Sequence, residues 1–466
     1  MRAIPPGAHG LVPEQTERRT PEMDGEPASP RLVLTIGLTA EDRHWLGRIE
    51  KPERFRYRTL GDPLAGENPE VLHPREFVGA ALDELRGLPQ KPAGIIAADD
   101  YPATLLAAAI RGAAGLPGPS FESSLMCAHK GWSRLLQREV VPESAPRFQL
   151  IDPDASYDAG NLELRFPFWV KPVKSALSYL GFRVSSPAEL AQVQARARTE
   201  LPRYARAFCE MLAMSAAPLP DALARTTGEW LIAEELMGGR QCTLEGWFAR
   251  GRMHLLGIVD SIRLPNRLSF SRFEYPSQLP RAVQAEMVCV AERIMRRTGF
   301  DDGLFNIEFF VHDGRPKIIE INPRMCLQFA DLYAKVNGRL THELLVELAS
   351  GIEPGPPRAR GRYRVAASFV LRTPEDRIVC RVPTEEDITR VEALFPGTVV
   401  HVLAQSGEKL SDHAQDSYTF RYGLVHLGAE SPPALRARFA HVMEMLHFEL
   451  EPVTTTIAQR VIGGSP

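Results

Sequence analysis

The stretch 303-GLFNIEFFVHDGRPKIIEINPR-324 decides the fold of this 466-residue chain. Two apolar runs flank His-Asp-Gly-Arg, and each run carries one glutamate, Glu308 in NIEFF and Glu320 in IIEIN. Apolar runs joined by Asp-Gly predict a β-hairpin. A carboxylate among Ile, Phe and Val side chains is costly to bury, so this pair of glutamates requires a physical reason.

The length of the hairpin turn determines which side chains face each other. A two-residue turn at Asp313-Gly314 pairs His312 with Arg315 and sends the two glutamates to opposite faces. A three-residue turn that includes Arg315 pairs His312 with Pro316 and places the glutamates directly opposite each other. Such turns commonly hold glycine in the left-handed conformation, so we predict the three-residue turn.

Two carboxylates that face each other across a hairpin repel. In the predicted register Glu308 and Glu320 share a face with Asn322, and a divalent cation between them would remove the repulsion. Oxygen ligands of this kind suit a hard ion such as Mg²⁺, which also takes water and phosphate oxygens. The side chains expected to pack inward on the other face are Ile307, Phe309, Ile319 and Ile321. From the hairpin alone, a solvent-facing strand whose acids meet Lys or Arg explains the pattern equally well.

The composition argues against several classes of protein. A net charge of −3 gives no electrostatic reason to expect a nucleic-acid or anionic-membrane partner. No apolar run reaches the ~20 residues of a membrane helix, and the first residues lack the apolar core of a secretory signal. The six cysteines are scattered without a C-x-x-C pair, which suits a reducing compartment. We therefore expect a cytoplasmic protein.

Composition and periodicity divide the chain into four segments. Residues 1–30, rich in Pro, Gly, Glu and Arg, predict a disordered tail. Residues 31–125 alternate strand and helix patterns, which predicts a parallel α/β unit. Residues 126–355 mix helices and strands around the hairpin and end at a Pro/Gly/Arg-rich stretch. Residues 356–466 predict an α+β domain of short strands closed by a helix.

Some polar residues have two explanations. Asp99 and Asp100 follow a predicted strand, and we expect them to cap a helix or to meet solvent. Arg263, Arg267 and Arg272 could hold a substrate carboxylate with paired hydrogen bonds. They could equally belong to a solvated loop.

Four segments, in order along the chain, resemble the ATP-grasp enzymes. The hairpin is similar to the segment in which that family holds two Mg²⁺ against ATP phosphates with Glu, Glu and Asn, and in which the following Arg assists the reacting group. The other three are similar to a helix that meets ATP, a strand with its phosphate-covering loop, and the hinge over adenine. They are 129-HKGWSRLLQREVVPESAPRF-148, 166-FPFWVKPVKSALSYLGFRV-184 and 230-WLIAEELMGGRQCTLEG-246.

The resemblance implies a fold and a set of site residues. The implied fold class is α/β and α+β: an N-terminal parallel α/β pre-ATP-grasp domain, an ATP-grasp domain of two α+β lobes, and a C-terminal α+β lid domain. The implied ATP ligands are Lys130, Lys171, Ser178, Glu234, Glu235, Leu236, Met237 and Gln241. The implied ligands of two Mg²⁺, which Mn²⁺ could replace, are Glu308, Glu320 and Asn322. The implied catalytic residues are Arg324 and Arg263.

The resemblance also implies an ATP- and Mg-dependent carboxylate–amine ligase. ATP would phosphorylate a small-molecule carboxylic acid, and a small-molecule amine would attack the acyl phosphate to give an amide, ADP and phosphate. The C-terminal strands and helix resemble a lid that keeps water from the acyl phosphate. A homodimer is common among similar enzymes.

Three departures from the family pattern leave other functions open. The loop KSALSYLG has one glycine where the family often has several, Gln241 replaces the usual ribose-binding Glu, and MCLQFADLY follows Arg324 in place of Gly-Gly. One alternative is biotin carboxylase-like ATP-dependent carboxylation, although the Gln-Val-Glu-His run and the Met-Lys-Met site of that chemistry are missing. The other alternative is a nucleotide-binding regulatory protein. The retained Lys171 and hairpin residues argue against it.

Overall fold

The computed structural model describes residues 29–61, 63, 72–98, 100–158, 160–175, 179–266, 268–355, 360–413, 415 and 418–453. Nearly all of the predicted tail, residues 1–30, therefore lies outside the described residues, and so do Asp99, Ser178 and Arg267. Within the described ranges, no helix is both long enough and apolar enough to span a membrane.

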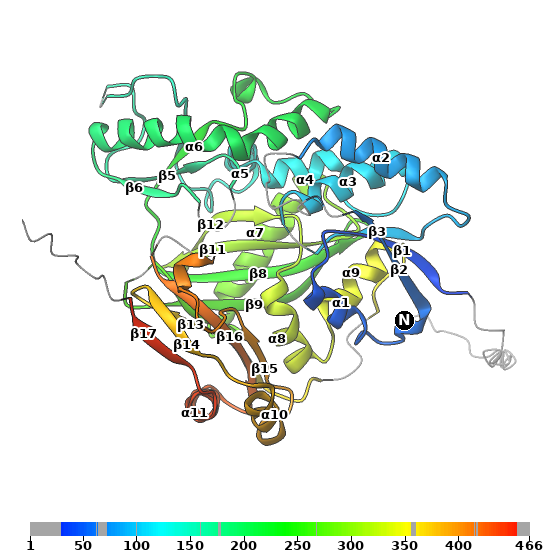
Figure 1. Ribbon diagram of the computed structural model, residues 1–466. Coiled ribbons are helices and arrows are strands. Elements are labelled where there is room, and N and C mark those ends of the chain that lie inside the picture. Colours follow the sequence, from blue (N-terminus) through cyan, green and yellow to red (C-terminus); the bar gives the residue numbers. More distant parts are fainter. Residues whose placement is uncertain are drawn as a thin grey trace, which may run out of the picture.

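A three-stranded parallel sheet forms the N-terminal part of the fold, in the order β2-β1-β3 (Figure 1). Its strands are β1 (Arg31–Ile36), β2 (Phe55–Gly61) and β3 (Gly94–Ile96). The helices of this part are α1 (Ala40–Leu46), α2 (Pro74–Arg86), α3 (Ala103–Ala114) and α4 (Phe121–Ala128). Leu34, Ile36 and Ile95 are fully buried in its core. The predicted parallel α/β unit is confirmed.

A second sheet has four antiparallel strands in the order β4-β7-β5-β6. They are β4 (Phe148–Ile151), β5 (Phe168–Pro172), β6 (Phe182–Val184) and β7 (Leu231–Glu235). Helix α5 (Lys130–Val140) precedes this sheet, and α6 (Pro187–Met214) runs along it at the top of Figure 1. Phe168, Val170 and Leu190 share an apolar core between the sheet and α6.

The largest sheet has eight antiparallel strands in the order β12-β11-β8-β9-β10-β13-β16-β15. In chain order they are β8 (Arg240–Ala249), β9 (Arg252–Arg263), β10 (Phe270–Tyr275), β11 (Gly303–His312), β12 (Arg315–Asn322), β13 (Val365–Thr373), β15 (Val399–Val402) and β16 (Phe420–Ala429). Three helices pack against it: α7 (Arg281–Thr298), α8 (Leu327–Asn337) and α9 (Thr341–Ala349). Because β10 pairs with β13, this sheet continues across the boundary predicted near residue 355.

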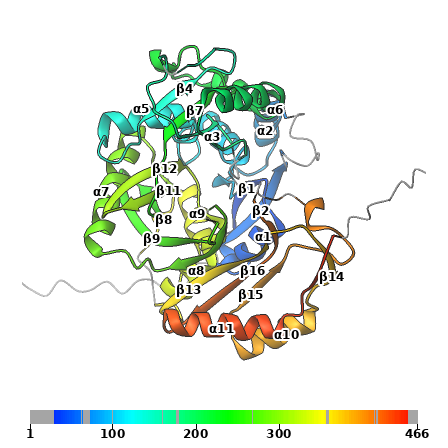
Figure 2. The ribbon, with the colours of Figure 1, turned by 90° about the vertical axis from the view of Figure 1, so that its left-hand side faces the viewer.

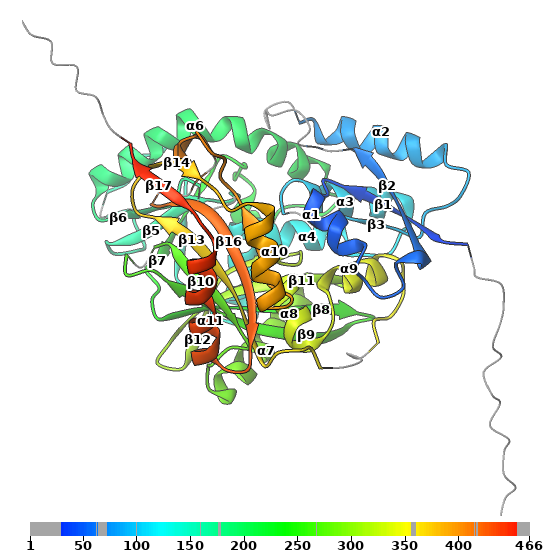
Figure 3. The same ribbon diagram turned by 60° about the horizontal axis from the view of Figure 1, so that its bottom comes forward.

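The C-terminal part adds two helices and a small sheet. Helices α10 (Glu385–Leu394) and α11 (Pro432–Met445) lie next to each other on the outer side of β16 (Figure 2, Figure 3). Strands β14 (Arg377–Arg381) and β17 (Glu449–Pro452) form an antiparallel pair. The described ranges also contain three short 3₁₀ turns: η1 (Pro52–Arg54), η3 (Asp221–Leu223) and η4 (Leu410–Asp412).

The β11–β12 hairpin has a two-residue turn, so the predicted three-residue turn is wrong. His312 pairs with Arg315, and Asp313 and Gly314 both have positive φ, 48° and 75°, as a type I′ turn requires. The predicted pairing of Glu308 with Glu320 is nevertheless confirmed.

A β-bulge at Ile319 reconciles these two results. Phe309 pairs with Ile318 while Glu308 pairs with Glu320, which leaves Ile319 as an extra residue on β12. Ile318 is therefore fully buried in the core, and Ile319, which we expected there, is only half-buried. Phe309 packs inward as predicted, and so do Ile307 and Ile321.

Candidate functional site

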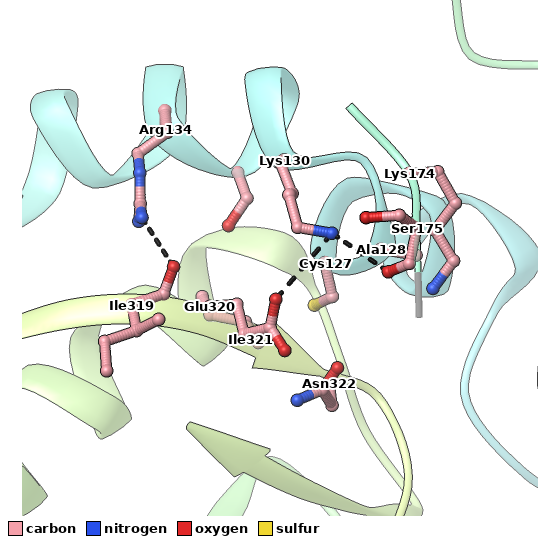
Figure 4. Close-up of a pocket in the computed structure, with 11 residues that line it drawn as sticks. Cys127, Ala128, Lys130, Arg134, Lys174, Ser175, Ile319, Glu320, Ile321 and Asn322 are labelled. Carbon is pink, nitrogen blue, oxygen red and sulfur yellow. Dashed lines mark hydrogen bonds and ion pairs between the residues drawn. The ribbon is translucent and has the colours of Figure 1, made fainter. Parts of the chain in front are cut away.

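A cavity lies between α5, the loop after β5, and β12 (Figure 4). We call it the Lys130 cavity. It encloses about 310 Å³, counting the part open to solvent, and its lining includes Lys130, Lys174, Glu320 and Asn322. Cationic side chains from the N-terminal half of the chain thus face the carboxylate strand of the hairpin.

Glu308 and Glu320 face each other across the hairpin. Burial, and then the charge of Glu320, raise the pKa of Glu308 to about 7. Burial alone would also raise the pKa of Glu320, but the charges of Lys130 and Lys171 outweigh it and hold that pKa below its usual value. The charge of Lys171 acts on both carboxyl groups, so Lys171 lies close enough to interact with both.

Lys130 is positioned by the start of α5. The ring Nδ1 of His129 accepts a hydrogen bond from the Trp132 N–H at 3.1 Å and caps this helix. Lys130 Nζ lies 3.7 Å from Glu320 Oε2 and donates to the Ser175 carbonyl at 3.2 Å (Figure 4). Burial lowers the pKa of Lys130 to about 8, although the charge of Glu320 opposes this.

Lys171 and Glu234 form a buried ion pair on neighbouring strands. Lys171 Nζ lies 2.9 Å from Glu234 Oε2, and Arg134 Nε lies 2.7 Å from Glu234 Oε1. Burial would raise the pKa of Glu234, but the charges of Arg134 and Lys171 hold it at about 2. Arg134 was not predicted as a site residue, although it lies one helical turn after Lys130 on α5.

The segment after β7 carries the predicted adenine hinge. Glu235 is ion-paired with Lys317 and, at 3.0 Å, with Arg147. Leu236 is exposed and Met237 is half-buried. Residues 236–239 follow the strand as a loop, which leads into β8.

Gln241 links two predicted site residues on the face of the large sheet. Its side-chain amide donates to Glu308 Oε2 at 3.0 Å, and its oxygen accepts from Arg263 Nε at 3.0 Å. The guanidinium of Arg263 lies over the rings of Phe270 and Phe310, at 5.2 and 5.3 Å. Arg263 therefore acts on Glu308 through Gln241 in this structure.

Arg324 is held by a residue of the N-terminal α/β unit. Its Nη2 lies 3.2 Å from Asp100 Oδ2, and Lys174 Nζ lies 3.3 Å from Asp100 Oδ1. Burial would raise the pKa of Asp100, but the charges of Lys174 and Arg324 hold it well below its usual value. The expectation of a helix cap or a solvated strand end therefore misses the ion pairs of Asp100. Its place at the carboxyl end of a parallel strand, where ligands bind in open α/β sheets, was the available signal.

The oxygen donors of the hairpin suit a hard divalent cation. Asn322 donates through its amide nitrogen to Asn306 Oδ1 at 3.0 Å, which turns its amide oxygen away from Asn306. Glu308, Glu320 and Asn322 come from paired strands and share one face. In the part of the chain that the structure describes, no three His, Cys, Asp or Glu side chains gather as a metal site. A cation here would therefore rely on two carboxylates, an amide and oxygens from outside the protein.

Comparisons with known proteins bear on the family and on the fold. Residues 164–333 match the family model described as ATP-grasp domain. Carnosine synthase 1 from Gallus gallus is 35% identical over 154 residues, which cover 32% of this chain but only 16% of that relative.

Solved structures extend the likeness to the whole fold. An L-amino acid ligase from Bacillus licheniformis has a TM-score of 0.64 at 16% identity, covering 91% of this chain and 99% of its own. Biotin carboxylase from Campylobacter jejuni has a TM-score of 0.60 at 13% identity, covering 90% and 92%. Phosphoribosylglycinamide synthetase from Anaerococcus prevotii has a TM-score of 0.59 at 11% identity, covering 91% and 100%. At these identities the likeness shows a shared fold.

Proposed function

This chain carries an ATP-grasp domain, and from that premise we propose that it is an ATP- and Mg²⁺-dependent carboxylate–amine ligase. The observation that carries the proposal is the opposed pair Glu308 and Glu320, with Lys130 and Lys171 across from it. Buried carboxylates that repel each other and face cations suit a site for metal-bound phosphates.

In this proposal ATP lies between the four-stranded sheet and the hairpin. Its phosphates would meet Lys130, Lys171 and Lys174, and its base would meet the hinge around residues 235–237. Mg²⁺, as two ions or with Mn²⁺ in its place, would neutralise the phosphate charge when held by the two glutamates and Asn322. Gln241 and Arg263 would orient Glu308 through the hydrogen bonds described above.

The proposed reaction has two steps. An oxygen of the substrate carboxylate attacks the γ-phosphorus of ATP, the bond to the β–γ bridging oxygen breaks, and ADP leaves. A neutral amine then attacks the acyl carbon, phosphate leaves with the former carboxylate oxygen, and the nitrogen loses a proton. Arg324, which forms an ion pair with Asp100, would stabilise the negative charge that develops on the transferred group.

The finer parts of the proposal follow the predicted layout. A pre-ATP-grasp domain would occupy residues 31–125, the two ATP-grasp lobes residues 126–355, and a lid residues 356–466. All six cysteines are unpaired, which supports a reducing, cytoplasmic setting. Small-molecule substrates and a homodimer complete the proposal.

One relative supports amide formation over carboxylation. Carnosine synthase 1, which is 35% identical over 154 residues, is named for synthesis. The likenesses to the L-amino acid ligase and to biotin carboxylase are likenesses of fold. Bicarbonate-dependent ADP release that free biotin stimulates would favour carboxylation instead.

A screen of ADP release tests the proposal directly. Carboxylic acids are crossed with amines in the presence of MgATP, and hydroxylamine then replaces the amine for every acid that stimulates ADP release. We expect a hydroxamate, because hydroxylamine traps an acyl phosphate. ADP release without any hydroxamate, for every stimulating acid, would contradict the ligase mechanism.

A further inference from the structure

Arg111, in the last turn of α3, is a buried cation outside the Lys130 cavity. Its side chain is 7% exposed and donates from Nη1 to the Ile95 carbonyl at 3.1 Å. Among the described residues, its buried Nε has no hydrogen-bond partner and the guanidinium has no carboxylate in an ion pair. Burial lowers the pKa of Arg111 to about 10. Burying such a charge without a counter-charge is costly.

Arg111 lines a second cavity, which we call the Arg111 cavity. It lies where the N-terminal α/β unit meets the large sheet and α9, and it encloses about 410 Å³, counting the part open to solvent. Its lining includes Thr104 of α3 and Arg324, the residue after the hairpin that faces Asp100. The two cavities share no lining residue. They are lined by consecutive residues of the chain, since Asn322 lines the Lys130 cavity and Pro323 lines the Arg111 cavity.

The wall beside Arg111 leaves room for its side chain only because residue 118 is glycine. Gly118 has a φ of +135°, and a Cβ there would lie 2.6 Å from Arg111 Nε. A larger residue would both strain the backbone and displace the guanidinium. Asp302 also lines this cavity, but its carboxylate is not in ion-pair distance of Arg111 and is near the Arg250 N–H, at 3.4 Å.

We propose that the Arg111 cavity is the subsite for a non-reacting carboxylate of a substrate, with Arg111 as its counter-charge. The inference rests on the proposed ligase function. A carboxylate that is to be phosphorylated belongs in the Lys130 cavity, near the cations and the hairpin acids. A carboxylate in the Arg111 cavity lies beside Arg324 but outside the Lys130 cavity, and is therefore a recognition group.

Such a carboxylate could come from an amino acid that supplies the amine or from the second acid group of a dicarboxylic acid. The chemistry at Arg111 is the same for both. A guanidinium binds a carboxylate with paired, charge-assisted hydrogen bonds, and lysine does not reproduce that geometry.

The test uses the full chain and does not depend on turnover. Thermal unfolding is measured with each standard amino acid and with its amide, with succinate and with its monoamide, and with sodium chloride and acetate. We expect one amino acid or the dicarboxylate to raise the melting temperature, and its amide not to. In Arg111→Met and Arg111→Lys the rise should be lost, whereas the exposed Arg86→Met should keep it.

The same variants are then assayed with an acid and amine pair found by ADP release. Loss of a charge-assisted contact should raise the KM of the carboxylate-bearing substrate about tenfold or more in Arg111→Met, with the KM of ATP unchanged. Three results would contradict the subsite. They are an unchanged KM in Arg111→Met, the same rise in KM for the substrate and for its amide, and a measurable rise in melting temperature that is equal with chloride and with acetate. Failure of every pair to release ADP would instead refute the ligase function, and the unfolding series would still decide the role of Arg111.

Folding of the variant provides a further check. Met replaces a buried charge for which the described residues provide no counter-charge, so ligand-free Arg111→Met should melt at or above the temperature of the wild type. A structural role would instead lower the melting temperature without any ligand, and that result would also overturn the proposal.

Discussion

Asp100 Oδ2 lies 3.2 Å from Arg324 Nη2, although 224 positions separate the two residues along the chain. The contact joins the end of the parallel sheet to the loop after the hairpin. Lys174, from the loop after β5, shares the same carboxylate at 3.3 Å. Three parts of the fold thus converge on one acidic side chain beside the proposed reaction centre.

Replacing Asp100 with Asn should impair catalysis. The amide cannot balance both cations, so Arg324 and Lys174 lose their shared orientation. We expect kcat/KM to fall roughly 10- to 100-fold, the range for loss of a charged hydrogen-bonding partner. ADP release under single-turnover conditions measures this. Asp154→Asn, at an exposed position, should behave as the wild type, and an unchanged kcat/KM in Asp100→Asn would refute the positioning role.

Replacing Glu320 with Gln should abolish turnover and leave the fold intact. The change relieves the repulsion on Glu308 but also removes the charge that Lys130 faces at 3.7 Å, so these two effects on stability oppose each other and the ligand-free protein should still fold. Loss of a direct metal ligand should reduce kcat at least about a hundredfold, since even outer-shell partners account for 10- to 100-fold effects. Mn²⁺ binding followed by electron paramagnetic resonance gives an independent readout. The exposed Glu163→Gln is the matched control, and Mn²⁺ binding that is equal in both variants would contradict the ligand assignment.

The bulge on β12 predicts unequal effects at two neighbouring isoleucines. Ile318 is fully buried and Ile319 is half-buried. Ile318→Ala should lower the free energy of unfolding by about 2–5 kcal/mol, as core truncations do, and Ile319→Ala should cost about 1 kcal/mol or less. Urea unfolding of both variants measures the difference. A larger loss of unfolding free energy in Ile319→Ala than in Ile318→Ala would contradict the bulge and support the register without it.

The hairpin shows how far the sequence could lead. Apolar alternation around Asp-Gly predicted both strands, and the choice of a three-residue turn predicted that the two glutamates should face each other. The prediction of the turn length was wrong because a type I′ turn and a bulge together give the same pairing of Glu308 with Glu320 as a three-residue turn. Nothing in IIEIN marks which isoleucine is extra, since burial against α7 and β8 decides it.

The remaining site residues depend on contacts between distant segments. Lys130 and Lys171 could be proposed from ordered motifs. Asp100, Arg134 and Lys174 gain their roles only when the parallel sheet, α5 and the loop after β5 come together. Their local sequence is equally typical of caps and solvated helix faces, so pattern alone could not separate these roles.

Glu245 should make stability depend on pH. Its side chain is completely buried on β8, one oxygen accepts the Cys326 N–H at 2.6 Å, and burial raises its pKa from 4.5 to about 8. The folded state therefore binds a proton that the unfolded state has released between about pH 4.5 and 8. The free energy of unfolding should fall across that window as the pH rises, by at most about 1.4 kcal/mol per pH unit.

Glu245→Gln isolates this effect, because glutamine keeps the acceptor oxygen and cannot ionise. Urea unfolding of both proteins at pH 5, 6.5 and 8 gives the difference in stability, in which the contributions of other titrating groups cancel. The variant should gain stability relative to the wild type as the pH approaches about 8. In the wild type, folding at that pH requires Glu245 either to take up a proton or to be buried with its charge, and glutamine requires neither. A difference in stability that stays constant over this range would show that Glu245 titrates near its ordinary pKa. The complete burial of Glu245 beside the loop after Arg324 argues against that result.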